Sequence, residues 1–106
     1  MAVDFETVTS LCKQYADNVR RAMPVDKVML FGSYAKGTAD EQSDVDICFF
    51  LDNYGGKGRR EILKELLWLM NGYDSAYFEP IVFETSELEN DNPFVKEILR
   101  TGKEIL

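Results

Sequence analysis

Two aspartates separated by one residue, Asp44 and Asp46, open the segment SDVDICFFLD, which turns apolar directly after them. Such an apolar run predicts a strand over about residues 44–51. Because side chains alternate along a strand, both carboxylates would project from one face, with Cα atoms about 6.6 Å apart. Paired carboxylates can hold a divalent cation, and oxygen-only ligation favours Mg²⁺, with Mn²⁺ as a second candidate. The pair is therefore a candidate metal site, and a solvated strand edge is the alternative.

A second candidate is the dipeptide Gly32-Ser33, which follows the apolar run VDKVMLF. That run predicts a buried strand over residues 25–31, and Gly32-Ser33 would open a turn or short helix at its end. Glycine lets a ligand approach the backbone closely, the N–H groups after it point outward, and the serine hydroxyl adds a donor. Such donors favour a phosphate group, although an ordinary turn would have the same sequence.

The spacing of the two motifs joins them into one candidate site. Ser33 precedes Asp44 by 11 residues, which is a hairpin-length connection. Phosphate donors and metal-binding carboxylates would then lie at the same end of adjacent strands. The joint pattern indicates chemistry more strongly than either part alone.

The composition excludes several classes of function. The chain has 106 residues, 45% of them hydrophobic, which predicts one globular domain over residues 1–106. Its 19 acidic and 12 basic residues give a net charge of -7, which argues against direct nucleic-acid binding. There is no histidine, so histidine metal sites and Ser-His or Cys-His catalysis are excluded.

The remaining sequence features favour a cytoplasmic protein that does not enter a membrane. The acidic N-terminal stretch MAVDFETVTS lacks the apolar core of a secretory signal, and no apolar run approaches the roughly 20 residues needed to span a bilayer. Cys12 and Cys48 have no CxxC spacing and are expected to be reduced, buried thiols.

Three helices are expected to support the two motifs. Apolar residues recur at spacings of three and four over residues 4–22, with Asp4 as a candidate N-cap. A second amphipathic helix is expected over residues 59–71. A third begins with Asn92 as its cap and Pro93 at its first position.

A third strand, over about residues 76–84, completes the expected sheet. Pro80 within it cannot donate to a strand ladder, so this strand should lie at an edge or carry a bulge. The order of elements predicts the α/β (α+β) class, with a small mixed sheet of about three to four strands flanked by helices.

The helix over residues 59–71 also carries large apolar residues whose placement matters for partners. Trp68 is expected in the core, or facing a partner if the helix is two-sided. The apolar stripe of this helix is expected to consist of Ile62, Leu63, Leu66, Leu67 and Met70.

The segments GSYAKG and SDVDI together resemble the GSxxxG…SDxD signature of the minimal nucleotidyltransferases, in the DNA polymerase beta-like superfamily. The resemblance extends over nearly the whole chain, from the leading helix to the last one. It implies the nucleotidyltransferase fold and Mg²⁺-dependent transfer of a nucleoside monophosphate, AMP from ATP, to a hydroxyl acceptor.

The resemblance also implies roles for individual residues. Family positions that bind the nucleotide correspond to Gly32, Ser33 and the basic residue Lys36, which would otherwise be ordinary solvated surface. The catalytic, metal-binding acids correspond to Asp44, Asp46 and Glu79. Glu79 stands where many relatives have aspartate, and a solvated acid at the sheet edge is the alternative for it.

Partners are implied by the resemblance as well. The substrate would be a nucleoside triphosphate, and small members of the family resemble antitoxins that act with an all-helical HEPN-type protein. A homodimer is a further possibility. The alternatives are a non-catalytic nucleotide- or metal-binding module of a two-protein complex, and a structural dimer without a ligand.

Overall fold

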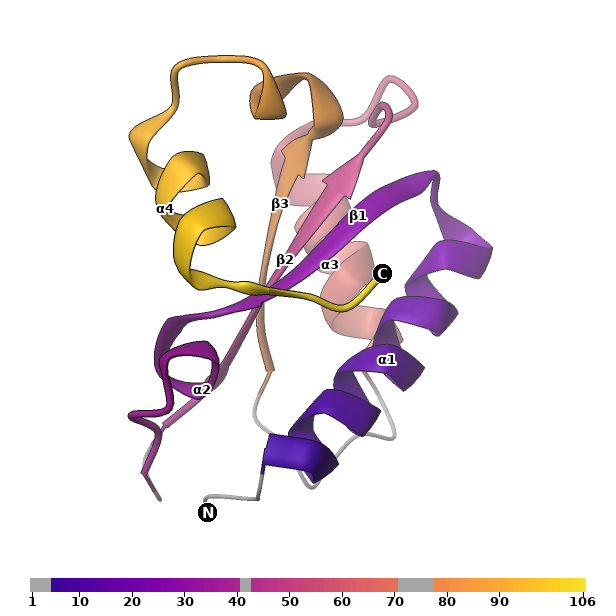
Figure 1. Ribbon diagram of the computed structural model, residues 1–106. Coiled ribbons are helices and arrows are strands. Elements are labelled where there is room, and N and C mark those ends of the chain that lie inside the picture. The colour runs from indigo at the N-terminus through magenta and orange to yellow at the C-terminus, as the bar shows by residue number, and fades with distance from the viewer. Residues whose placement is uncertain (1–4, 41–42, 71–77) are drawn as a thin grey trace.

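The computed structural model describes residues 5–40, 43–70 and 78–106 (Figure 1). The elements run in the order α1 (Phe5–Ala22), β1 (Val25–Phe31), α2 (Gly32–Lys36), β2 (Val45–Leu51), α3 (Arg59–Leu69), β3 (Phe78–Glu84), the 3-10 turn η1 (Thr85–Leu88), α4 (Pro93–Thr101) and β4 (Lys103–Glu104).

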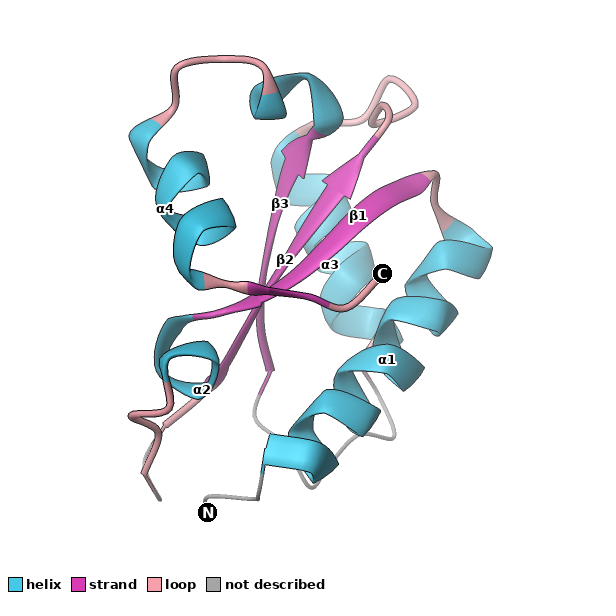
Figure 2. Ribbon diagram, in the orientation of Figure 1, coloured by secondary structure: helices cyan, strands magenta, loops and turns pink. Residues whose placement is uncertain are grey.

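The four strands form one mixed sheet in the order β3-β2-β1-β4 (Figure 2). β1 is antiparallel to β2 and β4, whereas β2 and β3 are parallel. The predicted fold class is confirmed. Pro80 lies in β3 at the edge of the sheet, as its missing N–H requires. The short strand β4 was not individually predicted, because two residues carry no alternating pattern.

Two layers of side chains cover the two faces of the sheet. Figure 1 shows α1 and α3 on one face and α4 on the other. The larger core lies under α1 and α3, and the hydroxyl of the buried Tyr15 donates to the carbonyl of Leu66, 2.5 Å away, which ties the two helices together. The smaller core lies under α4 and consists of Met29, Cys48, Phe50, Val95 and Ile98.

β2 is the central element, because it contributes to both cores. Its residues Val45, Ile47, Phe49 and Leu51 face α1 and α3, and Cys48 and Phe50 face α4. Both cysteines are free and buried, as predicted. Alternation along β2 puts Asp46 on the α4 face, next to Cys48.

The expected helices are confirmed within the described residues. The side chain of Asn92 accepts hydrogen bonds from the backbone N–H groups of Phe94 and Val95, which confirms it as the cap of α4. Asp4, expected to cap α1, lies outside the described residues, and so do the expected end of α3 at Asn71 and the first residues of the third strand.

Of the two placements expected for Trp68, the core is wrong, and the side chain faces outward as the alternative has it. Its side chain is 74% exposed, and the side chain of Leu67, expected in the apolar stripe, is 50% exposed. α3 buries Ile62 and Leu66, which are four residues apart, and Leu67 and Trp68 follow on the side that faces away from the sheet. Within the described ranges, no helix combines the length and apolar character that crossing a membrane would need.

Candidate active site

The acidic motif lies where β2 begins. The strand starts at Val45, so Asp44 is exposed and lies one residue before it, while Asp46 is the second strand residue and is half-buried. β1 ends beside this point, because Phe31 is the register partner of Asp46. Gly32 follows Phe31 directly, so the two motifs meet at one end of adjacent strands, as the sequence predicts.

Asp46 also has an acidic neighbour on its other side. Glu79 of β3 is its register partner in the parallel pair, so their Cα atoms lie about 4.8 Å apart and their side chains share a face. The negative charge of Glu79 is close enough to act on Asp46 and disfavours the ionised form of its carboxyl group. The structure thus brings Asp46 and Glu79 together although 33 residues separate them in sequence.

The surroundings of Asp46 make its charged form unfavourable. Burial is the largest cause, followed by the negative charges of Glu79 and Asp44 and by a hydrogen bond that the protonated Asp46 carboxyl group can donate to Glu79, and together they raise the pKa of Asp46 to about 6. Because a nearby cation would relieve these effects, the site favours a positive charge beside Asp46.

Gly32 fits against this carboxyl group. Its φ is +71°, a conformation that side-chain-bearing residues rarely adopt, and a Cβ at this position would overlap Oδ2 of Asp46. Glycine is therefore needed at position 32 for two reasons, the backbone turn into α2 and the close approach of the Asp46 carboxyl group.

The two other predicted nucleotide-binding residues lie on α2. Ser33 is half-buried in its first turn, next to Gly32. Lys36, at the end of the helix, is exposed, and its charge acts on Glu97 of α4. Its side chain thus lies toward α4, whereas the charges that act on Asp46 are those of Glu79 and Asp44.

The carboxylate oxygens at this site suit a hard cation, but they do not by themselves form a complete set of metal ligands. Carboxylate oxygens are the ligands that Mg²⁺ prefers, and it commonly takes one or two of them together with substrate phosphates. Within residues 5–40, 43–70 and 78–106, no three His, Cys, Asp or Glu side chains are gathered closely enough to form a complete metal cage. The pair Asp46 and Glu79 therefore fits a metal that a phosphate ligand would help to hold.

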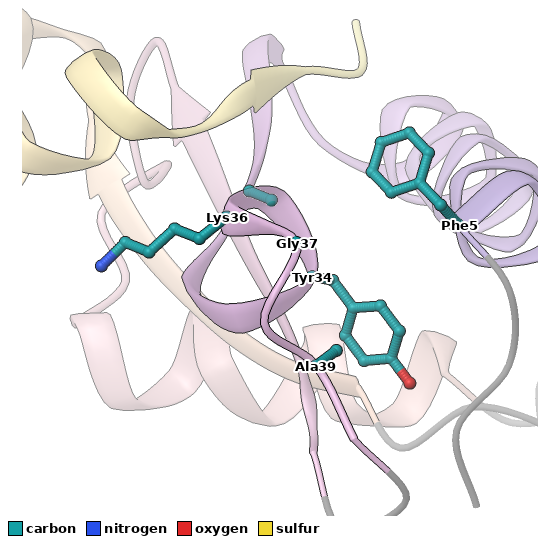
Figure 3. A pocket seen from close by; sticks show the side chains of 6 residues that line it. Phe5, Tyr34, Lys36, Gly37 and Ala39 are labelled. Atoms are coloured by element: carbon teal, nitrogen blue, oxygen red, sulfur yellow. The ribbon is translucent and has the colours of Figure 1, made fainter.

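A separate cavity of about 370 Å³ lies between α2 and the start of α1, with Phe5 and Tyr34 on its walls. Figure 3 shows the rings of these two residues flanking the space, with the Lys36 side chain pointing away from it. Tyr34 belongs to the core under α1, on the opposite face of the sheet from Asp46. This cavity is therefore distinct from the acidic site.

We expect replacement of Glu79 by glutamine to lower the pKa of Asp46 toward its ordinary value. The change removes both the negative charge and the hydrogen bond that hold this pKa up, and leaves burial and Asp44 in place. Carbon-detected NMR titration of the carboxyl groups would measure the change. Glu84→Gln is the matched control, because Glu84 is the last residue of the same strand and lies at the end away from Glu79. This change should leave the pKa of Asp46 unaffected. An unchanged pKa in Glu79→Gln would show that the two acids do not interact.

Comparison with known proteins agrees with this geometry. Residues 8–106 match the family described as "Polymerase beta, Nucleotidyltransferase". A Methanocaldococcus jannaschii protein, MJ0141, provisionally named a protein adenylyltransferase, is 32% identical over 82 residues, which cover 76% of this chain and 79% of that protein.

Two solved structures share the fold. A crystal structure from Sulfolobus solfataricus, provisionally described as a nucleotidyltransferase, has a TM-score of 0.66 at 22% identity and covers 80% of this chain and 74% of its own. A toxin-antitoxin crystal structure with AMP-PNP has a TM-score of 0.59 at 18% identity, covering 89% and 72%.

The fold and the paired motifs define a nucleotidyl-transferring enzyme. The family match covers almost the whole chain, so the protein belongs to the polymerase beta nucleotidyltransferase family. The resemblance inferred from GSYAKG and SDVDI is thereby confirmed.

Proposed function

We propose that the protein transfers AMP from ATP, in a Mg²⁺-dependent reaction, to a hydroxyl group on a partner protein. The observation that carries the proposal is the position of Asp46, which lies against Gly32 at the start of α2 and beside Glu79 on the neighbouring strand. The name of the relative MJ0141 supports AMP as the transferred group and a protein as the acceptor.

The proposed chemistry follows from the residues at the site. An acceptor hydroxyl oxygen attacks the α-phosphorus, the bond between that phosphorus and the bridging oxygen breaks, and pyrophosphate leaves with the electron pair. Asp44, Asp46 and Glu79 would hold Mg²⁺, which supplies positive charge at the attacking and leaving oxygens. Gly32 and Ser33 would bind the phosphates through backbone N–H groups and a hydroxyl. A carboxylate of the pair accepts the hydroxyl proton.

Lys36 is proposed to bind phosphate in the loaded enzyme. Its flexible side chain is exposed at the end of α2, and its charge helps to lower the pKa of Glu97 on α4. Rotation of the lysine side chain would bring its ammonium group to a phosphate oxygen.

The acceptor is proposed to belong to an all-helical protein of the HEPN type, with this chain as the antitoxin. A solved structure with the same fold is a toxin-antitoxin complex with AMP-PNP, which supports a two-protein assembly. Exposed Trp68 and Leu67 on α3 offer apolar surface for such a contact or for a homodimer.

A second candidate function is a non-catalytic module that binds a nucleotide or a metal within a two-protein complex. The observation that favours it is the incomplete gathering of the described acidic side chains around a metal position. It predicts nucleotide binding without release of pyrophosphate.

Incubation with α-labelled ATP, Mg²⁺ and a candidate HEPN-type protein tests both candidates. The expected result is label on the partner, one pyrophosphate released for each AMP attached, and loss of both when Mg²⁺ is chelated. The matched control carries Asp52→Asn, because Asp52 is an exposed acid just after the far end of β2. Binding of ATP with neither label nor pyrophosphate would favour the non-catalytic module.

A further inference from the structure

Phe94, the second residue of α4, is a large aromatic side chain that the fold leaves accessible. It is 49% exposed, whereas Phe49 and Phe50 are fully buried in β2. Its backbone is nevertheless fixed, because its N–H donates to Oδ1 of the Asn92 cap at 3.0 Å. The exposed ring therefore lies on a well-anchored helix start.

Two further aromatic rings hold the ring of Phe94 in place. Phe31 of β1 meets it nearly edge-on, with ring centroids 6.0 Å apart and an interplanar angle of 87°. Phe83 of β3 lies 6.1 Å away at 60°. Such contacts restrict the orientation of Phe94 while half of its surface stays open to a ligand.

The position of Phe31 places Phe94 close to the acidic pair. Phe31 is the register partner of Asp46, so their side chains share the α4 face of the sheet. Phe94 thus contacts Phe31, the residue that lies beside Asp46 in the sheet. The sequence motifs give no role to Phe31 or Phe94, although Phe31 directly precedes Gly32.

α4, which carries Phe94, lies beside α2 and β1. The charge of Lys36 on α2 helps to lower the pKa of Glu97 on α4, after the larger effect of the hydrogen bond from Arg100. Figure 1 shows α2 and α4 as neighbours beside the same end of β1. Phe94 is therefore on a helix that adjoins α2 and β1, the elements that carry the predicted phosphate-binding residues and the register partner of Asp46.

We propose that Phe94 is the stacking platform for the nucleobase of the bound nucleoside triphosphate. This inference rests on the proposed function, in which Gly32, Ser33 and the acids bind the phosphates. A nucleobase is planar and is joined through the ribose to the α-phosphate, so it lies one sugar away from the phosphate site. A held aromatic ring with an open surface matches one flat side of a base.

The pattern fits a specificity for nucleotides over simple polyphosphates. Stacking works for any base, so Phe94 would raise the affinity for all nucleoside triphosphates and discriminate little among them. Tripolyphosphate, which has the phosphates but no base, would bind without help from Phe94.

Calorimetric titration in Mg²⁺ with ATP and, separately, with tripolyphosphate tests the inference. Phe94→Leu keeps an apolar side chain but removes the aromatic plane, and should raise the Kd for ATP on the order of ten-fold. The Kd for tripolyphosphate should not change. Phe94→Trp should restore the wild-type affinity for ATP.

Leu99→Ala is the matched control. Leu99 is also an exposed apolar residue of α4, at 37%, but it lies five residues further on, on another side of the helix. Its loss should change neither affinity. Thermal melts of all three variants would show that each remains folded.

Two results would overturn the inference, and they are distinguishable. If wild type binds both ligands and Phe94→Leu binds ATP as tightly as wild type does, the stacking role is wrong and the proposed function stands. If wild type binds neither ATP nor tripolyphosphate, the proposed function fails and the inference fails with it.

Discussion

Replacing Asp46 by asparagine is expected to abolish nucleotidyl transfer and, at neutral pH, to make the free protein more stable. Asparagine keeps the shape of the side chain but removes the charge on which metal binding depends. Removal of one preorganised electrostatic group typically costs 10²–10³-fold in rate, and we expect at least about 10³-fold here because the metal position would be lost.

The gain in stability follows from the direction of the pKa shift. The pKa of Asp46 is raised from 3.8 to about 6 by folding, chiefly through burial and the charge of Glu79. Between these two values the folded state binds more protons than the unfolded state, so the free energy of unfolding falls as the pH rises. Above about pH 6 the native protein holds a charge that its surroundings disfavour.

Asp46→Asn removes this penalty, so its advantage should be absent near pH 4 and greatest above pH 6. Two pKa units correspond to about 2.7 kcal/mol, and because Asp46 is partly exposed we expect about 1 kcal/mol after screening by solvent. For a domain of this size that amounts to a rise of about 4 °C in Tm.

Melting curves measured at several pH values, with and without Mg²⁺ and ATP, would check both parts. Ligands should raise the Tm of wild type but not that of Asp46→Asn, because mass action needs a binding site. Asp44→Asn is the comparison: its side chain is exposed, so it should impair transfer with a smaller change in stability. Transfer at the wild-type rate in both variants would refute the proposed mechanism.

The sequence predicted that the two motifs meet because each motif is local in the chain. Gly32-Ser33 follows one apolar run, and Asp44–Asp46 opens the next. Because a short connection joins these two antiparallel strands, the end of the first strand must lie beside the start of the second. The strand bounds at residues 25–31 and the edge position of Pro80 follow from equally local rules, namely strand periodicity and a missing N–H.

The pairing of Asp46 with Glu79 could not be derived from the same rules. It depends on the register of two parallel strands joined through α3, and a shift of one residue would turn Glu79 to the other face. Family resemblance suggested Glu79, but only the structure places it in register with Asp46. The core placement of Trp68 failed because helical spacing alone does not say which side of α3 meets the sheet.

Gly32→Ala is the second substitution expected to have a large effect, on both stability and transfer. The φ of +71° disfavours any side chain, and the new Cβ would overlap Oδ2 of Asp46. Backbone strain together with overpacking should cost on the order of 2–4 kcal/mol in the free energy of unfolding. Displacement of the Asp46 carboxyl group by about 1 Å should slow transfer by about 10²-fold.

Gly37→Ala separates the two causes of this loss. Gly37 ends the same short helix with a nearly identical φ of +77°, but a Cβ there has no heavy atom within 4 Å. It should therefore show the backbone cost alone, about 1–2 kcal/mol, with transfer close to wild type. The free energy of unfolding from urea titration and the transfer rate would be measured for both variants.

The double variant Gly32→Ala/Asp46→Ala then tests whether the contact itself is responsible. Asp46→Ala removes the carboxyl group that the new Cβ would overlap, so adding Gly32→Ala to it should cost little more than Gly37→Ala does. If Gly32→Ala is equally costly with and without the Asp46 carboxyl group, glycine is required there by the backbone alone. In that case the close packing of Gly32 against Asp46 has no part in holding the site.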